Sequence, residues 1–317
     1  MVKMAGEGLE PPGQVVLVLQ GGGALGAYQV GVFQAMHEAG IEPDWVIGTS
    51  IGAINGAIIA GNPPAGRMRR LDAFWDHVRN GTGIELPRLW PGLDHLFANF
   101  ATVTQGIPAF FSPRPQAWGG MSAPLGVEAA SYYSTEPLRQ TLEELVDFSL
   151  INEGHPRLTV GAAHVRTSMM HYFDSKDMEV APAHIMASGA LPPAFPAVRI
   201  DGELYWDGGI LSNTPTERIF DDHPRRNSLI FAVHLWNPTG DEPTTIWEIL
   251  NRHKDIQYSS SSRATSCVSA RRTSSATSSP SSWNTCPRRR GGIRCARSSR
   301  NITATRACMW CGCSRRQ

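Results

Sequence analysis

The first 260 residues of the chain contain no cysteine, because all six cysteines lie between residues 261 and 317. This absence excludes a disulfide framework, a thiolate nucleophile and a cysteine-ligated metal from most of the chain. No apolar stretch reaches the roughly 20 residues that a membrane-spanning helix needs. Residues 1–13, an N-terminal arm, lack the apolar run of a secretory signal, so a cytoplasmic location is expected.

Residues 259–317 form a tail rich in Ser, Arg and Cys, and this tail has few of the large apolar residues that a hydrophobic core needs. Between residues 261 and 317 there are 12 Arg, but no Leu, Phe, Tyr, Lys, Asp or Glu. A segment so poor in large apolar residues and so rich in like charge is expected to be disordered. The remaining residues hold 17 basic and 28 acidic side chains, so the near-neutral chain consists of two parts with net charges of opposite sign.

Three other interpretations of the tail stay open. Its arginines suit nucleic acid or an anionic membrane, but they lack interleaved aromatic residues, so no nucleic-acid partner is expected. Cys308, Cys311 and Cys313 suit a metal, but no second Cys or His pair completes a zinc ligand set, so no metal is expected. The abrupt change after the patterned run 247–258 is also typical of out-of-frame translation of a GC-rich gene, and we hypothesise a reading-frame shift near residue 260.

Residues 14–258 alternate between short apolar runs and segments with helical spacing, and they are expected to form one catalytic domain. The runs that predict strands are 14–19, 45–47, 158–163, 229–235 and a hairpin over 198–206 turned at Asp201-Gly202. The segments that predict helices are 27–40, 53–60, 68–78 and 138–145. This order predicts an α/β fold with a mostly parallel sheet, covered on both faces, and with chemistry at the carboxyl ends of the strands.

Residues 81–134 carry little periodicity but many aromatic residues and prolines. A long irregular segment in a compact domain is usually a lid or a binding loop, or else is disordered. Its aromatic stretch, Ile107 to Met121, is the part from which we expect peripheral contact with a membrane surface.

A candidate nucleophile stands between the second predicted strand and the next helix. Gly48-Thr49-Ser50-Ile51-Gly52 fits G-x-S-x-G, whose glycines permit the tight turn that exposes the serine. The helix that follows adds a positive dipole end and free backbone N–H groups. The alternative is a serine that merely caps the helix, but the strand-turn-helix context favours the nucleophile.

The first predicted strand ends in a glycine-rich segment, Gly21-Gly22-Gly23-Ala24-Leu25-Gly26, whose backbone N–H groups could bind an anion. The segment also fits G-x-G-x-x-G, which makes a nicotinamide-dinucleotide-binding oxidoreductase the rival hypothesis. That fold expects an acidic residue at the end of the second strand, about 20 residues on. Here Gly48-Thr49-Ser50 stands in that place, so the rival is disfavoured.

The base is harder to identify, because ten histidines are scattered over the first 260 residues without a motif. Asp207-Gly208-Gly209 follows the hairpin strand and leaves a carboxylate on an unobstructed turn, although a loop Asp that holds its own turn is the plainer interpretation. A Ser-Asp-His esterase would place its base after Asp207, at His223, His234 or His253. A non-enzymatic binding protein also stays open.

Taken together, these motifs resemble the patatin-like phospholipase family. Gly21 to Gly26, the G-x-S-x-G at Ser50, and Asp207-Gly208-Gly209 followed by Asn213 and Pro215 occur in the family's order. The stretch from Met186 to Pro196 resembles the family's block before its catalytic Asp. The match covers about residues 14–258 and is most similar to a bacterial subgroup with a C-terminal extension.

The resemblance implies a three-layer α/β/α sandwich and a Ser-Asp dyad without histidine. On that basis Ser50 attacks an ester carbonyl of a phospholipid or related lipid, Asp207 moves the proton, and an acyl-enzyme forms. The implied oxyanion hole consists of Gly21, Gly22, Gly23 and Ala24, the nucleophile elbow contains Gly48 and Gly52, and the Asp turn contains Gly208 and Gly209. The family's frequent basic residue in the glycine motif is Leu25 here. No cofactor and no particular oligomeric state is implied.

Overall fold

The computed structural model describes residues 13–80, 107–119, 124–259 and 309–311. The main sheet has eight strands, with β6 beside β5 and the others in the order β10-β9-β1-β2-β5-β8-β7. Its strands are β1 (Gln14–Leu19), β2 (Trp45–Thr49), β5 (Arg157–His164), β6 (Met170–Asp174), β7 (Val198–Ile200), β8 (Glu203–Asp207), β9 (Ser228–Val233) and β10 (Met309–Cys311). Two short strands, β3 (Ser112–Pro113) and β4 (Tyr133–Ser134), pair separately.

The sheet is mixed rather than uniformly parallel. From β10 through β9, β1 and β2 to β5 every pairing is parallel, whereas β5–β6, β5–β8 and β7–β8 are antiparallel. Within the parallel half the central strands β1 and β2 are buried on both faces and are rich in Val, Ile and Leu. The antiparallel half grows from the 198–206 hairpin, which returns toward β5 and delivers Asp207 to the middle of the sheet.

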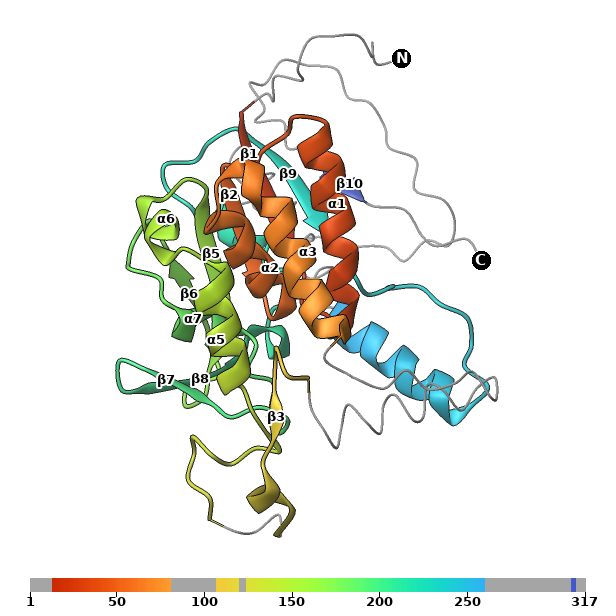
Figure 1. Cartoon of the computed structure of the whole chain (residues 1–317). Coiled ribbons are helices and arrows are strands. Elements are labelled where there is room, and N and C mark those ends of the chain that lie inside the picture. Colours follow the sequence, from red (N-terminus) through yellow and green to blue (C-terminus); the bar gives the residue numbers. More distant parts are fainter. Residues whose placement is uncertain (1–12, 81–106, 120–123, 260–308, 312–317) are drawn as a thin grey trace, which may run out of the picture.

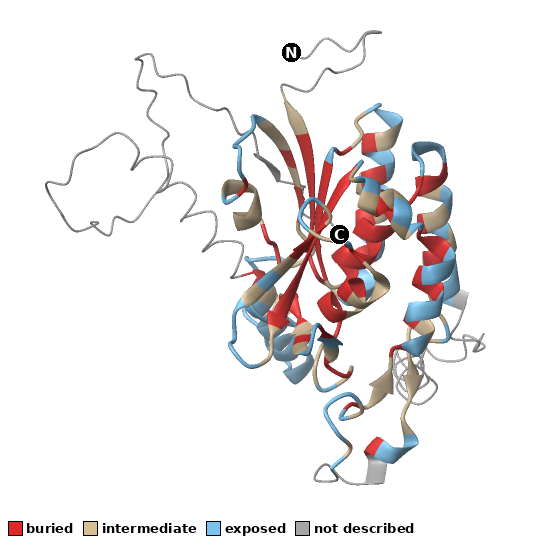
Figure 2. Ribbon diagram, turned by 90° about the vertical axis from the view of Figure 1, so that its left-hand side faces the viewer, coloured by how far each residue is buried: buried red, intermediate tan, exposed pale blue. Residues whose placement is uncertain are grey.

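Most helices pack against one face of the sheet, where the larger apolar core lies (Figures 1 and 2). They are α1 (Ala27–Glu38), α2 (Ile51–Ala60), α3 (Pro64–Asn80), α5 (Glu136–Leu145), α6 (Phe148–Glu153) and α7 (Pro182–Ser188). The helix α2 is buried along its whole length, which its small and apolar sequence AINGAIIA allows. It therefore serves as the central helix of this layer.

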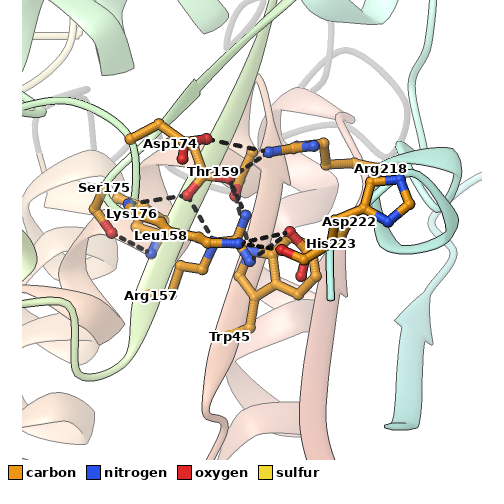
Figure 3. Close-up of polar contacts among 11 residues, drawn as sticks. Trp45, Arg157, Leu158, Thr159, Asp174, Ser175, Lys176, Arg218, Asp222 and His223 are labelled. Carbon is orange, nitrogen blue, oxygen red and sulfur yellow. Dashed lines mark hydrogen bonds and ion pairs between the residues drawn. The ribbon is translucent and has the colours of Figure 1, made fainter. Parts of the chain in front are cut away.

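The opposite face carries a smaller apolar cluster, in which Ile219 of the short helix α8 (Glu217–Phe220) packs on strand residues such as Trp45. Beside it lies a polar cluster (Figure 3) in which Arg157 stacks on the Trp45 ring, 3.9 Å from its centroid. The same guanidinium donates two hydrogen bonds to Asp174, of 2.7 and 2.5 Å, and one of 3.0 Å to Asp222. This face is thus held by buried ion pairs as well as by apolar contacts.

The α/β sandwich expected from the sequence is confirmed, and its strands and helices largely coincide with the predicted ones. The predicted order did not reveal β3, β4, β6, α6, α7, α8 or the helix of residues 246–259. It also did not reveal β10, which pairs with β9 although it lies in the tail that was expected to be disordered. The described part leaves out residues 1–12, 81–106, 120–123, 260–308 and 312–317. These omitted residues make up most of the arm, of the tail and of the irregular segment. No helix in the described part has the length and hydropathy to cross a membrane.

Candidate active site

Ser50 stands at a sharp turn between β2 and α2. Its φ of 56° and ψ of −125° lie in a region that side-chain-bearing residues rarely adopt. The turn needs the flanking glycines, because a Cβ on Gly48 would lie 2.3 Å from the carbonyl oxygen of Gly52, and a Cβ on Gly52 would lie 2.1 Å from that of Leu19. This strained turn leaves Ser50 half-buried at the carboxyl end of the sheet, as a nucleophile elbow does.

The turn at Ser50 is held by a neighbouring serine that sequence reasoning did not single out. The backbone N–H of Ser50 donates to Ser188 Oγ at 3.0 Å, and the Ser188 hydroxyl donates to the carbonyl of Gly161 at 2.7 Å. Ser188 is fully buried at the end of α7. It lies in the family-like block from Met186 to Pro196, which was the only sequence signal for it. Ser188 therefore ties the elbow to β5.

Asp207 reaches the same place from the other side of β5. Thr49, next to Ser50, pairs with Gly161, and Asp207 pairs with Ala162. Two adjacent residues of one strand thus bring together Ser50 and Asp207, which are 157 positions apart in the sequence.

The Asp207 carboxylate is buried, with 3% of the residue exposed. Burial raises the pKa of Asp207 to about 6, while hydrogen bonds from Ser50 and from the backbone N–H of Gly209 limit the rise. The Gly209 N–H lies 2.7 Å from Oδ1. Gly208 packs so closely that a Cβ there would lie 2.3 Å from the Gly161 carbonyl oxygen. The site therefore combines a carboxylate of raised pKa, that of Asp207, with a hydrogen-bonded serine hydroxyl, that of Ser50.

The glycine-rich segment forms the short 3-10 helix η1 (Gly23–Gly26) after β1. Gly21 approaches the nucleophile, since a Cβ on it would lie 3.1 Å from Ser50 Cβ. Among the described residues no acceptor takes the backbone N–H groups of Gly22, Gly23 or Ala24. The family resemblance assigned these three donors and that of Gly21 to the oxyanion hole, but the Gly21 N–H donates to the Asn213 carbonyl at 3.2 Å. Gly21 thus contributes a close approach rather than a free donor.

Several buried polar side chains fix the carbonyl groups of this segment. The Gly21 carbonyl accepts from Trp236 Nε1 at 2.7 Å and from Asn213 Nδ2 at 3.0 Å. The Gly26 carbonyl accepts from Asn55 Nδ2 at 3.0 Å. These hydrogen bonds hold the carbonyl groups toward the protein interior, and the N–H groups of the segment are left accessible at the surface. Asn213 was noted in the sequence only as part of the family pattern, and Trp236 was missed.

The alternatives raised by the sequence find no support in the described part of the chain. There, no histidine has a recorded contact with Ser50 or Asp207, and the influences on the Asp207 pKa come from burial, Ser50 and Gly209. The carbonyl of His223 accepts from Lys176 Nζ at the other end of the sheet, and His253 is exposed. No group of three His, Cys, Asp or Glu residues in that part is placed to hold a metal ion.

Two rings of the aromatic stretch expected to contact a membrane lie in the described part of the chain. Phe110 and Phe111 are half-buried and their rings pack against each other and against Phe195, with centroids 5.4 to 5.9 Å apart. Tyr133 completes this cluster, 4.8 Å from Phe111. The two rings are therefore largely used in internal packing.

Comparisons with known proteins place the chain in a family. A model of the family described as patatin-like phospholipase matches residues 17–220. Patatin-like phospholipase domain-containing protein 6 of Homo sapiens is 27% identical over 203 residues, which is 64% of this chain and 12% of that protein. Lysophospholipase nte1 of Neurospora crassa is 25% identical over 247 residues, 75% of this chain and 13% of that protein. The chain thus spans only a small part of these relatives. The crystal structure of VipD from Legionella pneumophila has 17% identity and a TM-score of 0.39, covering 70% of this chain and 50% of that one.

Proposed function

Since the chain belongs to the patatin-like phospholipase family, we propose that it hydrolyses carboxyl esters of phospholipids or related lipids through an acyl-enzyme on Ser50. The observation that carries this proposal is the pairing of a strained, half-buried serine with a buried aspartate whose pKa is raised to about 6. A carboxylate with that pKa is a better base at neutral pH than an ordinary aspartate, and it remains mostly ionised there. No third residue is needed to orient it, because the Gly209 N–H already does so.

In the first half of the reaction the Ser50 oxygen attacks the carbonyl carbon of the ester, and its proton passes to Asp207. The negative charge that develops on the carbonyl oxygen is stabilised by the free N–H groups of Gly22, Gly23 and Ala24. When the carbon–oxygen bond to the alcohol breaks, Asp207 returns its proton to the leaving oxygen. The products of this half are a lysophospholipid or other alcohol and the acyl-enzyme.

In the second half a water molecule replaces the alcohol. Asp207 accepts a proton from this water as its oxygen attacks the acyl carbon, and the same donors stabilise the second tetrahedral intermediate. Collapse of that intermediate breaks the bond to Ser50, which regains its proton from Asp207, and a fatty acid leaves. The raised pKa of Asp207 suits both directions of proton transfer.

The direct test measures hydrolysis of a chromogenic short-chain ester and a fluorogenic phospholipid by the wild type and by Ser50→Ala. The matched control is Ser175→Ala, which removes a hydroxyl that accepts from the Leu158 N–H at the opposite end of β5. We expect Ser50→Ala to abolish both activities and Ser175→Ala to keep them. A fluorophosphonate, which bonds through phosphorus to an activated serine and loses fluoride, should label Ser50 in the wild type. Full activity of a folded Ser50→Ala protein would overturn the proposal.

A further inference from the structure

The helix of residues 246–259, light blue in Figure 1, exposes an apolar surface that nothing in the described part of the chain covers. Of the eleven large apolar side chains that are exposed among the described residues, five lie on this helix, and the most exposed is Ile246 at 79%. These five are Ile246, Trp247, Ile249, Leu250 and Ile256. A patch of this kind on a soluble fold is unusual unless it binds something.

The polar face of the helix, not its apolar face, contacts the protein. The Arg252 guanidinium donates to the carbonyls of Asn237 and Pro238, each at 3.0 Å, and Asp255 accepts from the Asn237 N–H at 3.3 Å. At 100° per residue Arg252 and Asp255 lie on the side opposite Ile246 and Leu250. An ordinary surface helix turns its apolar stripe to the core. Here the amphipathic arrangement is inverted, and the apolar stripe faces outward.

The last turn of the helix is fixed at the candidate active site. The backbone carbonyl of Tyr258 accepts from Gln20 Nε2 at 3.3 Å and from Asn213 Nδ2 at 3.4 Å. The Tyr258 ring packs on Trp236, with centroids 5.0 Å apart, and Trp236 and Asn213 are the residues that hold the Gly21 carbonyl. Burial and, second, the charge of Asp207 raise the pKa of Tyr258. The helix is therefore attached to the elements that form the site.

Other exposed apolar side chains belong to segments that lead into or out of the site. Leu25 is part of η1, and Tyr28 is in the first turn of α1, with 53% of the residue exposed. Ile210 and Leu211 follow Asp207 by three and four positions and are also exposed. Apolar side chains are thus exposed on the helix and also on the segments that carry the glycine-rich motif and follow Asp207.

We propose that helix 246–259 is the element that docks the protein on a lipid bilayer and turns the site toward it. This inference rests on the proposed function, because a lipid ester hydrolase must draw its substrate from a bilayer. An amphipathic helix with Trp and Leu outward binds in the plane of a bilayer surface, and 14 residues extend about 21 Å along it. The lipid substrates of the family and the attachment of the helix to Gln20, Asn213 and Trp236 favour a lipid surface over a protein partner as the occupant.

The test is sedimentation of the full chain with phosphatidylcholine vesicles, with and without added phosphatidylglycerol. The variant Ile246→Gln/Leu250→Gln/Ile256→Gln changes only exposed side chains and keeps residues that favour a helix. The matched control Val127→Gln/Met169→Gln removes equally exposed apolar side chains from other elements. We expect vesicle binding to fall at least about tenfold in the helix variant, since three buried aliphatic side chains contribute several kcal/mol, and to be unchanged in the control.

Enzyme assays separate this inference from the proposed function. The helix variant should lose hydrolysis of vesicular phospholipid but keep hydrolysis of a soluble short-chain ester, whereas Ser50→Ala should lose both and still bind vesicles. An inactive wild type that binds vesicles through the helix would overturn the proposed function alone. Equal vesicle binding by the helix variant and the wild type would overturn the docking proposal. So would a wild type that does not bind vesicles but forms dimers that the helix substitutions dissociate, because the occupant would then be a second copy.

Discussion

Two buried aspartates lie against opposite ends of the same strand, and their environments give them opposite properties. Asp174 pairs with Thr159 near the start of β5, and Asp207 pairs with Ala162 near its end. Burial would raise the pKa of Asp174, but hydrogen bonds from Arg157 and its charge outweigh burial and bring that pKa below its usual value. Among the described residues no cation influences Asp207, and its pKa rises to about 6. The difference shows that the pairing partner, not burial, decides what a carboxylate can do.

The two ends also differ in what their polar groups are used for. Around Asp174 three side chains donate to the carboxylate, namely Arg157, Arg218 at 3.0 Å and the Thr159 hydroxyl at 2.8 Å (Figure 3). This end borders a cavity of about 620 Å³ that is separate from Ser50. At the Asp207 end the donors on the glycine segment are left free. The donors at the Asp174 end bind groups of the protein itself. At the Asp207 end the free N–H groups are the donors that the proposed function assigns to the substrate.

Replacing each aspartate by asparagine should give the largest contrast. Asp207→Asn removes the proposed base and should lower kcat/KM for a soluble ester by about 10²- to 10⁴-fold, with the fold retained by circular dichroism. Asp174→Asn should leave kcat per folded molecule within about twofold of wild type, because Asp174 does not touch the dyad. Comparable losses of kcat in both folded variants would contradict the functional separation of the two ends.

Among the variants considered, removal of the cation that pairs with Asp174 should lower the free energy of unfolding the most. Arg157→Met leaves Asp174 buried without its main partner, and breaking such a pair typically lowers the free energy of unfolding by about 3–5 kcal/mol. Urea denaturation followed by tryptophan fluorescence measures this loss. The control is Arg139→Met, whose guanidinium is half-exposed and pairs with Glu136 on the surface, and it should change stability by under about 1 kcal/mol. A loss as small as the control's would show that the cluster contributes little.

The opposite pKa shifts predict opposite pH dependences. Because the pKa of Asp207 is raised, its ionisation opposes folding increasingly as pH rises from about 4 to 6, so Asp207→Asn should stabilise the protein at pH 8 by at most about 3 kcal/mol. Because the pKa of Asp174 is lowered, its contribution to stability is present above its usual pKa and is lost as the pH falls through the lowered value. Activity on a soluble ester should decline as the pH falls below about 6. Denaturation curves measured from about pH 2 to 8 and kcat/KM measured from about pH 4 to 8 test both, and an Asp207→Asn protein less stable than wild type at pH 8 would contradict the assignment.

The smallest expected effect concerns the serine that holds the elbow. Ser188→Ala leaves the Ser50 N–H and the Gly161 carbonyl without their partner, which should cost about 1–3 kcal/mol of stability. If Ser188 positions the nucleophile, kcat should fall while KM stays constant, and Ser188→Thr, which keeps the hydroxyl, should recover part of kcat. A stability loss without any change in kcat would assign Ser188 a purely structural role.

The residues of the candidate site could be singled out from the sequence more readily than the residues of the Asp174 cluster. Ser50, Asp207 and the glycine segment were identified because turns next to strands need particular residues, and such needs are visible in short motifs. The Asp174 cluster was not identified, since its members are 17 and 65 positions from Arg157 and no local pattern links them. The parallel strands were recognisable as Val-rich runs, whereas β6 (MHYFD) mixes polar and aromatic residues and shows no such run. Long-range pairing of single side chains leaves little trace in one sequence.

The outward apolar helix escaped prediction for a different reason. Its spacing is that of an ordinary amphipathic helix, and a helical pattern does not say which side meets the protein. The contacts of Arg252 with the carbonyls of Asn237 and Pro238 decide the orientation, and they depend on the loop that follows β9.

The close packing of Gly208 on β5 has a consequence for how the chain can vary. A side chain at this position would meet only backbone atoms, at 2.3 Å from the Gly161 oxygen, 2.7 Å from its carbon and 3.2 Å from the Ala162 nitrogen. Backbone atoms in the middle of a sheet cannot move aside as the end of a flexible side chain can. In a saturation library selected for activity, Gly208 should therefore be as intolerant of replacement as Asp207, although it takes no part in the chemistry, and drift in this stretch would be confined to the neighbouring exposed residues Ile210 and Leu211.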